Sequence, residues 1–233
     1  MRLFSLAALA CLASPGALFA QPLAQPAAQP ATVRVDYLHS GNALSEGYAL
    51  DRVVIEPLPW PGDMTRTLDD TDRGINKVEV VDAKTGRLLY SRGFSTVFGE
   101  WKTTEEAAKA TRAFGESVRF PKPDAPVRVR ILKRDERNQF SIVWTADIDT
   151  DALDVVRKQP PAPAKPIPIR VSGPSPAKVD LLILGDGYTQ AELGKFERTA
   201  KKLADYLFTV SPFKERAQDF NVWGLAVPTE ASG

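Results

Sequence analysis

The chain has 233 residues, with 30 lysines and arginines against 29 aspartates and glutamates, so its formal net charge is +1. This length suits one or two domains. The balanced charge gives no support for binding to nucleic acid or to a membrane surface.

The first twenty residues predict a secretory signal peptide. Arg2 precedes a run of uncharged, mostly apolar residues, and Ala20 supplies a small residue for cleavage. The only cysteine, Cys11, lies in this run, so the exported protein would contain no disulfide and no thiolate chemistry. No later segment is long and apolar enough to span a bilayer. We therefore expect a periplasmic or secreted protein, in which a Pro/Ala/Gln spacer at residues 21–32 follows the signal peptide at residues 1–20.

Residues 33–156 predict an antiparallel β-sandwich with its own hydrophobic core. Polar turn residues at 82–86 and 135–138 each join two apolar runs, so two antiparallel hairpins are expected. Thr103 and Glu106 have the spacing of a helix capping box, which predicts one helix starting there. Apolar and polar residues alternate with the period of half-buried strands in Val33–Tyr37, Lys77–Val80 and Val127–Ile131.

Residues 157–178 predict a semi-rigid, extended linker between two domains. They contain seven prolines and five basic residues, and no acidic residue. Solubility is the simplest explanation for this local charge, with a functional basic segment as the alternative.

Residues 179–233 predict the start of an α/β domain. The mostly apolar run 179–184 is typical of a parallel strand, which is usually buried on both faces. Thr189 and Glu192 form a second capping-box spacing, and the apolar stripe that follows predicts an amphipathic helix ending before Pro212.

Residues 222–227 predict a second buried strand, which completes a strand, helix and strand unit. Two parallel strands and one helix cannot cover both faces of a sheet. We therefore expect the remaining strands of this domain to lie beyond Gly233, and residues 179–233 to expose apolar surface.

The turn Gly185–Tyr188 is the nearest feature to a functional site in this unit. It follows a predicted buried strand, and α/β folds usually place ligands at the carboxyl ends of such strands. Asp186 and Tyr188 are therefore candidate residues for the rim of a cleft, where Asp186 could orient a loop or bind a cation. The favoured alternative is a tight structural turn in which backbone amides donate hydrogen bonds to Asp186. Gln190 stands where a dinucleotide-binding loop needs its third glycine.

Seven separated blocks of the chain carry a family resemblance in the expected order. They are Val33–Asn42, Tyr90–Phe94, Phe98–Trp101, Thr103–Ala107, Leu184–Thr189, Ser211–Lys214 and Phe220–Val222. The first four resemble the N-terminal domain of the IgA-peptidase family of secreted zinc metallopeptidases, and the last three resemble the start of its catalytic domain.

This resemblance implies hydrolysis of peptide bonds in protein or peptide substrates. In the family a His-Glu-x-x-His helix holds the zinc, and its glutamate acts as the general base. A catalytic zinc needs about three protein ligands, and this chain has one histidine, His39, which we expect to be an ordinary surface or hydrogen-bonded residue. No catalytic or metal residue of the family can be assigned to this sequence, so we expect zinc only in a longer parent protein.

Two hypotheses follow from the sequence. In the first, the chain is an inactive N-terminal fragment of an exported zinc endopeptidase. Its fold would be α+β overall, with a β-sandwich accessory domain followed by the truncated start of a zincin-like catalytic domain. In the second, the sandwich is a secreted protein-binding or glycan-binding module and the α/β piece is vestigial.

Overall fold

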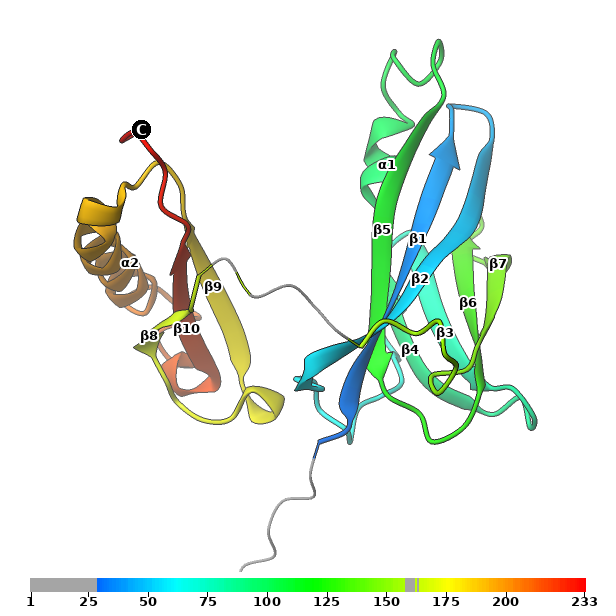
Figure 1. The fold of residues 1–233 in the computed structure, drawn as a ribbon, viewed down its shortest axis with the longest axis horizontal. Helices are drawn as coiled ribbons and strands as arrows, with labels where there is room; N and C mark the ends of the chain where they lie inside the picture. Colours follow the sequence, from blue (N-terminus) through cyan, green and yellow to red (C-terminus); the bar gives the residue numbers. More distant parts are fainter. Residues whose placement is uncertain (1–28, 158–161, 163) are drawn as a thin grey trace, which may run out of the picture.

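The computed structural model describes residues 29–157, 162 and 164–233 (Figure 1). The predicted signal peptide and most of the predicted spacer lie outside the described residues. The described part is α+β, with two antiparallel sheets followed by a smaller mixed sheet that carries one long helix. None of the helices in this part is long and apolar enough to cross a membrane.

Two antiparallel sheets form the first part of the structure. The first sheet has the order β2-β1-β5, and the second has the order β4-β3-β6-β7. The strands are β1 (Ala31–Gly41), β2 (Glu46–Pro59), β3 (Asn76–Asp82), β4 (Leu88–Phe94), β5 (Arg112–Pro121), β6 (Val127–Arg134) and β7 (Phe140–Ile148).

One hydrophobic core joins these two sheets, as the predicted β-sandwich requires. In β1 and β6 alternate residues point inward, so the buried positions follow the period of two seen in the sequence. Each fully buried side chain of this size contributes roughly 1.5–3 kcal/mol of transfer free energy. The buried core includes Val33, Val35 and Tyr37 of β1, Val118 and Phe120 of β5, Val78 and Val80 of β3, and Val127, Val129 and Ile131 of β6.

Both predicted hairpins are present. β3 pairs antiparallel with β4, and β6 pairs antiparallel with β7. In the first turn the Asp82 carboxylate accepts hydrogen bonds from the amides of Thr85 at 2.7 Å and Lys84 at 3.1 Å. Gly86 then takes a φ of +72°, which glycine adopts without a steric penalty. In the second turn Asn138 occupies the left-handed region at 61°.

The predicted helix after Thr103 is wrong. The helix α1 covers Val97–Trp101 instead, and Thr96 is its N-cap, with the hydroxyl accepting from the Gly99 amide at 2.8 Å. Thr103 donates its hydroxyl to the carbonyl of Glu100, and residues 102–109 form turns and a bend. The capping-box spacing fails because the Glu106 carboxylate is engaged elsewhere, accepting hydrogen bonds from Trp101 and Arg112.

The last part of the chain contains the predicted strand, helix and strand. β9 (Val179–Gly185) and β10 (Phe220–Ala226) are parallel neighbours, and α2 (Leu193–Leu207) connects them. A third strand, β8 (Ile167–Arg170), pairs antiparallel with β10. Ile167–Arg170 falls within the predicted linker, and this part of the linker forms a strand of the sheet. Short 3₁₀ helices cover Ser175–Ala177 (η1), Gln190–Glu192 (η2) and Ala217–Asp219 (η3).

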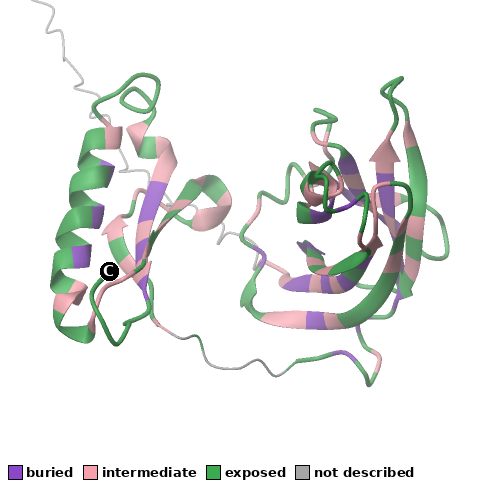
Figure 2. Cartoon of the chain, turned by 90° about the horizontal axis from the view of Figure 1, so that it is seen from above, coloured by how far each residue is buried: buried purple, intermediate pink, exposed green. Residues whose placement is uncertain are grey.

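The helix α2 covers one face of this small sheet. Its buried residues are Phe196, Ala200 and Ala204. Figure 2 shows the buried positions of this helix on the side that faces the strands. The opposite face of β9 is open, and Leu182 and Leu184 are 48% and 69% exposed. The prediction of exposed apolar surface on this unit is therefore confirmed.

Asn221 on β10 ties the segment between β8 and β9 to the sheet. Its side-chain oxygen accepts hydrogen bonds from the amides of Ser172 at 2.8 Å and Gly173 at 3.2 Å. Its side-chain nitrogen donates to Asp180 at 2.8 Å. Because Asn221 is fully buried, these partners satisfy a polar group that would otherwise destabilise the sheet.

Candidate functional site

The turn after β9 is compact. Gly187 has a φ of +72°, a conformation that favours glycine. Gly185 is needed for a different reason, because a Cβ at that position would lie 2.6 Å from the Phe196 ring. The Asp186 side chain is exposed and accepts no hydrogen bond from any described residue. The expected hydrogen bonds from backbone amides to Asp186 are therefore absent from this part of the chain.

Tyr188 has a packing role. Its ring meets Phe196 edge to face, with 5.4 Å between the ring centroids. Its backbone carbonyl accepts a hydrogen bond from the Thr229 amide at 2.9 Å, and Gly187 accepts one from Gly233 at 2.9 Å. These contacts give Tyr188 a structural explanation, and a role of Asp186 and Tyr188 at the rim of a cleft stays a prediction.

The predicted capping box is present at Thr189, the N-cap of η2, which leads directly into α2. The Glu192 carboxylate accepts a hydrogen bond from the Thr189 amide at 3.1 Å. The Thr189 hydroxyl donates to the same carboxylate at 3.0 Å, and the Glu192 amide donates to the backbone carbonyl of Thr189 at 2.9 Å. The capping-box spacing in the sequence therefore identifies the beginning of the helical segment correctly.

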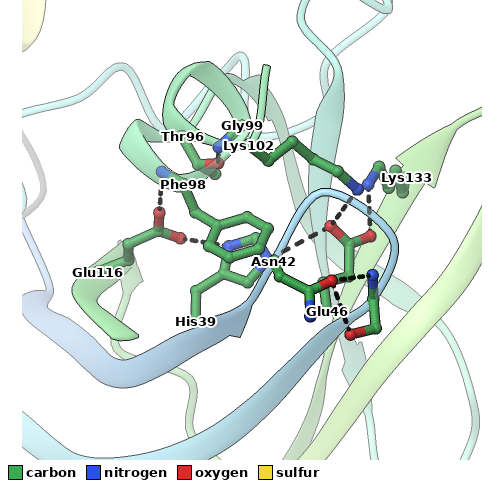
Figure 3. Close-up of polar contacts among 10 residues, drawn as sticks. His39, Asn42, Glu46, Thr96, Phe98, Gly99, Lys102, Glu116 and Lys133 are labelled. Carbon is green, nitrogen blue, oxygen red and sulfur yellow. Dashed lines mark hydrogen bonds and ion pairs between the residues drawn. The ribbon is translucent and has the colours of Figure 1, made fainter. Parts of the chain in front are cut away.

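A group of polar side chains surrounds the buried His39 in the sandwich (Figure 3). His39 is near the end of β1 and is 2% exposed, so the prediction of a surface residue is wrong and that of a hydrogen-bonded residue is confirmed. Its ring stacks between Tyr48 of β2 and Phe98 of α1, with centroid distances of 4.2 Å and 4.0 Å.

Two carboxylates face opposite edges of the His39 ring. Nδ1 lies 3.1 Å from Oε2 of Glu116, and the other oxygen of Glu116 accepts a hydrogen bond from the Phe98 amide at 3.3 Å. Nε2 lies 3.6 Å from Oε2 of Glu46. This distance is too long for a hydrogen bond, and the buried Nε2 has no hydrogen-bond partner among the described residues.

Glu46 connects His39 to two lysines. Lys133 of β6 donates a hydrogen bond to one carboxylate oxygen, and Nζ of Lys102 lies 3.5 Å from the other. Burial alone would raise the pKa of Glu46, but the hydrogen bond from Lys133 and the charges of Lys133, Lys102 and His39 together lower it. Asn42 fixes the preceding loop by accepting hydrogen bonds from the Leu44 and Ser45 amides. Glu46 is therefore held as a carboxylate facing His39.

A pocket of about 380 Å³ opens beside this group. This volume is in the range of small-molecule sites. Tyr48 stacks on His39, and its ring lies 6.0 Å from that of Tyr37. The hydroxyls of both tyrosines are buried, and burial raises the pKa of each. The lining includes His39, Glu46, Asn76, Thr96, Lys102 and Lys133.

The groups around His39 do not suit zinc. Its two ring nitrogens face different glutamates on opposite edges, so no single point has three donors around it. Within the described residues, no set of three or more histidine, cysteine, aspartate or glutamate side chains could hold a metal ion.

Comparison with known families agrees with the resemblance in the sequence. Residues 25–145 match the family described as Peptidase M64 N-terminus, and residues 167–233 match IgA Peptidase M64. The first match begins before β1 and ends within β7, and the second begins at the first residue of β8. Two domains of one peptidase family therefore follow each other in the expected order. The chain belongs to the IgA peptidase M64 family. No curated protein matches it.

The sequence alone does not indicate which charged side chains gather around His39. Glu46, Lys102, Glu116 and Lys133 come from four separate segments, and none stands in a recognisable motif. Only the strand register could have indicated Glu116, because Tyr37, two residues before His39, pairs with Glu116 across β1 and β5. That register depends on tertiary packing, which a single sequence does not reveal.

Proposed function

We propose that this chain is the N-terminal part of an exported zinc-dependent endopeptidase. The observation that carries the proposal is the pair of consecutive family matches, one to the N-terminal domain and one to the peptidase itself. Membership of a peptidase family makes proteins or peptides the substrate class. The sandwich would then act as an accessory domain that assists folding, positions substrate or covers the cleft.

The unit at residues 167–226 would be the start of a zincin-like catalytic domain. Its parallel strands β9 and β10, with α2 on one face, support this assignment. Leu182 and Leu184 on the open face of β9 provide apolar surface for further elements of such a domain.

The metal site would be formed by residues outside this chain. Three ligands are usual for a catalytic zinc, and the single histidine here already lies between two glutamates. We therefore expect the chain by itself to bind no stoichiometric zinc and to cleave no peptide.

Metal analysis and a peptidase assay on the purified chain test this expectation. One tightly bound zinc per chain, together with peptide hydrolysis that a chelator abolishes, would contradict it. The codons that follow Gly233 test the larger proposal. A His-Glu-x-x-His sequence within them supports a peptidase, whereas a stop codon directly after Gly233 favours a binding module.

Export would depend on the first twenty residues. Arg2, the apolar run and Ala20 support cleavage by a signal peptidase and delivery to the periplasm or the medium. N-terminal sequencing of protein recovered from these fractions should begin at Gln21. Recovery of uncleaved chain from the cytosol alone would count against export.

The second candidate function is a binding module formed by the sandwich. The observation in its favour is the pocket beside His39, which contains a buried ring nitrogen without a partner among the described residues. This function is compatible with the first, since an accessory domain can also hold a ligand.

A further inference from the structure

The pocket beside His39 is lined by lysines whose hydrogen-bond donors are only partly used by the described residues. An ammonium group carries three N–H donors, and within the described residues Lys102 and Lys133 each donate only to Glu46. Both lysines line the pocket and are about one-quarter exposed, at 25% and 27%. Their remaining donors are therefore available to a ligand in the pocket.

His39 adds a third donor when its ring is protonated. In that state both ring nitrogens carry hydrogen, and each faces a glutamate. Nδ1 is within hydrogen-bond distance of Glu116, but Nε2 lies 3.6 Å from Glu46 and is left without a close acceptor. A buried polar group in this position is costly unless a partner enters the pocket.

The charges of the group indicate the kind of partner. With His39 protonated, three cations, from His39, Lys102 and Lys133, meet only two carboxylates, those of Glu46 and Glu116. One positive charge in the partly buried group is then left without a counter-charge. A single additional carboxylate would balance it and would accept the free donors through charge-assisted hydrogen bonds.

We propose that this pocket binds a carboxylate group, held by Lys102, Lys133 and the Nε2–H of His39. The carboxylate belongs to an acidic side chain or to the free C-terminus of a peptide. Glu100 also lines the pocket, but it is exposed and therefore screened by water. The inference concerns the sandwich alone and does not depend on the proposed peptidase function.

The lone histidine gives a direct measurement. His39 is the only histidine of the chain, so in protein without a histidine tag one set of imidazole NMR signals reports on the pocket. N-acetylglutamate α-amide supplies a side-chain carboxylate, and N-acetylalanine supplies a terminal one. N-acetylglutamine α-amide and N-acetylalanine amide are the matched uncharged controls.

At about pH 6 we expect at least one acid to shift the His39 signals with saturation. The acid that binds more tightly identifies the source of the carboxylate. Titration to about 10 mM suffices, because a ligand with a Kd of about 1 mM then occupies most of the protein. Absence of a saturable shift with both acids, or equal binding of the uncharged amides, would overturn the proposal.

Lysine variants test whether the named donors hold the carboxylate. Lys102→Gln and Lys133→Gln should each weaken binding at least about tenfold, since each removes a charged donor. Lys109→Gln is the matched control, because Lys109 is exposed and does not line the pocket. Lys102 lies outside the sheets, so its variant remains informative if Lys133→Gln fails to fold. Unchanged affinity in a folded Lys102→Gln protein would also contradict the proposal.

Discussion

The sandwich and the α/β unit bury their apolar residues in different ways. In the sandwich, each sheet covers the other, and residues such as Val33 and Ile131 are completely buried. In the α/β unit, α2 covers one face of the sheet, while Leu184 on the other face is 69% exposed. The comparison shows that the burial of an apolar strand residue depends on the elements that pack against its face of the sheet.

Truncation of a core side chain should give the largest loss in the free energy of unfolding, and this loss should differ between the two regions. Phe120→Ala in the sandwich removes a fully buried ring and should lower the free energy of unfolding by about 3–5 kcal/mol. Leu184→Ala, on the open face, should change it by less than about 0.5 kcal/mol. Denaturant unfolding followed by tryptophan fluorescence measures both. Equal losses would show that the open face is covered in solution.

A methyl group at Gly185 should disturb the contact between strand and helix in the α/β unit. The added Cβ would lie 2.6 Å from Phe196 and 2.9 Å from the Cβ of Ala226, so Gly185→Ala should destabilise this unit by about 1–3 kcal/mol. Hydrogen exchange in β9 and β10 measures the loss. Gly115→Ala in β5 is the matched control, because its Cβ would meet no atom within 4 Å. Protection that is unchanged in Gly185→Ala would mean that α2 does not pack as described.

Two threonines test the corrected position of the helix in the sandwich. Thr96→Ala removes the N-cap of α1 and should lower the free energy of unfolding by about 1 kcal/mol. Thr103→Ala should have a smaller effect, because its exposed hydroxyl only donates to the Glu100 carbonyl. Thermal or denaturant unfolding of the two variants compares them. A larger loss in Thr103→Ala would favour the helix predicted from the sequence.

The smallest expected effect concerns the loop before β3. A hydrogen bond from the Thr71 hydroxyl, with further bonds from the Thr71 and Gly93 amides, lowers the pKa of Asp69 to about 2. Because the folded pKa lies below the unfolded value of about 3.9, the stabilisation is complete above about pH 4 and is lost as the pH falls towards 2. Solvent screening should keep it below about 1 kcal/mol.

Unfolding of the wild type and of Asp69→Asn across this pH range measures the effect. The difference in stability should be largest above pH 4 and should shrink towards pH 2. Asp70→Asn is the matched control, since the exposed Asp70 carboxylate accepts no hydrogen bond from any described residue. A difference that is constant with pH would show that the loss comes from packing.

The sequence predicts the strands and their hairpins well, because alternation and turn residues are local signals. Val127–Ile131 and the turn after Val81 are examples, and both are found where expected. The family resemblance is also confirmed. The helix near Thr103 fails because a capping-box spacing does not show whether its glutamate is free, and Glu106 is bound to Trp101 and Arg112.

The site was less accessible to prediction than the fold. Of the groups around His39, Phe98 and Glu116 lie far from it in the sequence, whereas Glu46 and Tyr48 lie on the neighbouring strand β2. The burial of His39 follows from the pairing of β1 with β2 and β5. β8 was missed for a related reason. Prolines predict an extended segment correctly, but they do not show whether a strand such as β10 is available to pair with it.

The strand β8 also limits how far the two regions can separate. Val156 is bridged to Val54 on the sandwich, and Ile167 is the first residue of β8, so ten residues, 157–166, connect the anchored ends. Whatever its conformation, a connection of this length reaches at most roughly 35 Å. A tether this short keeps each region at a high effective concentration near the other, about millimolar for short flexible links. Even a weak association between them would then be populated without any need for high protein concentration.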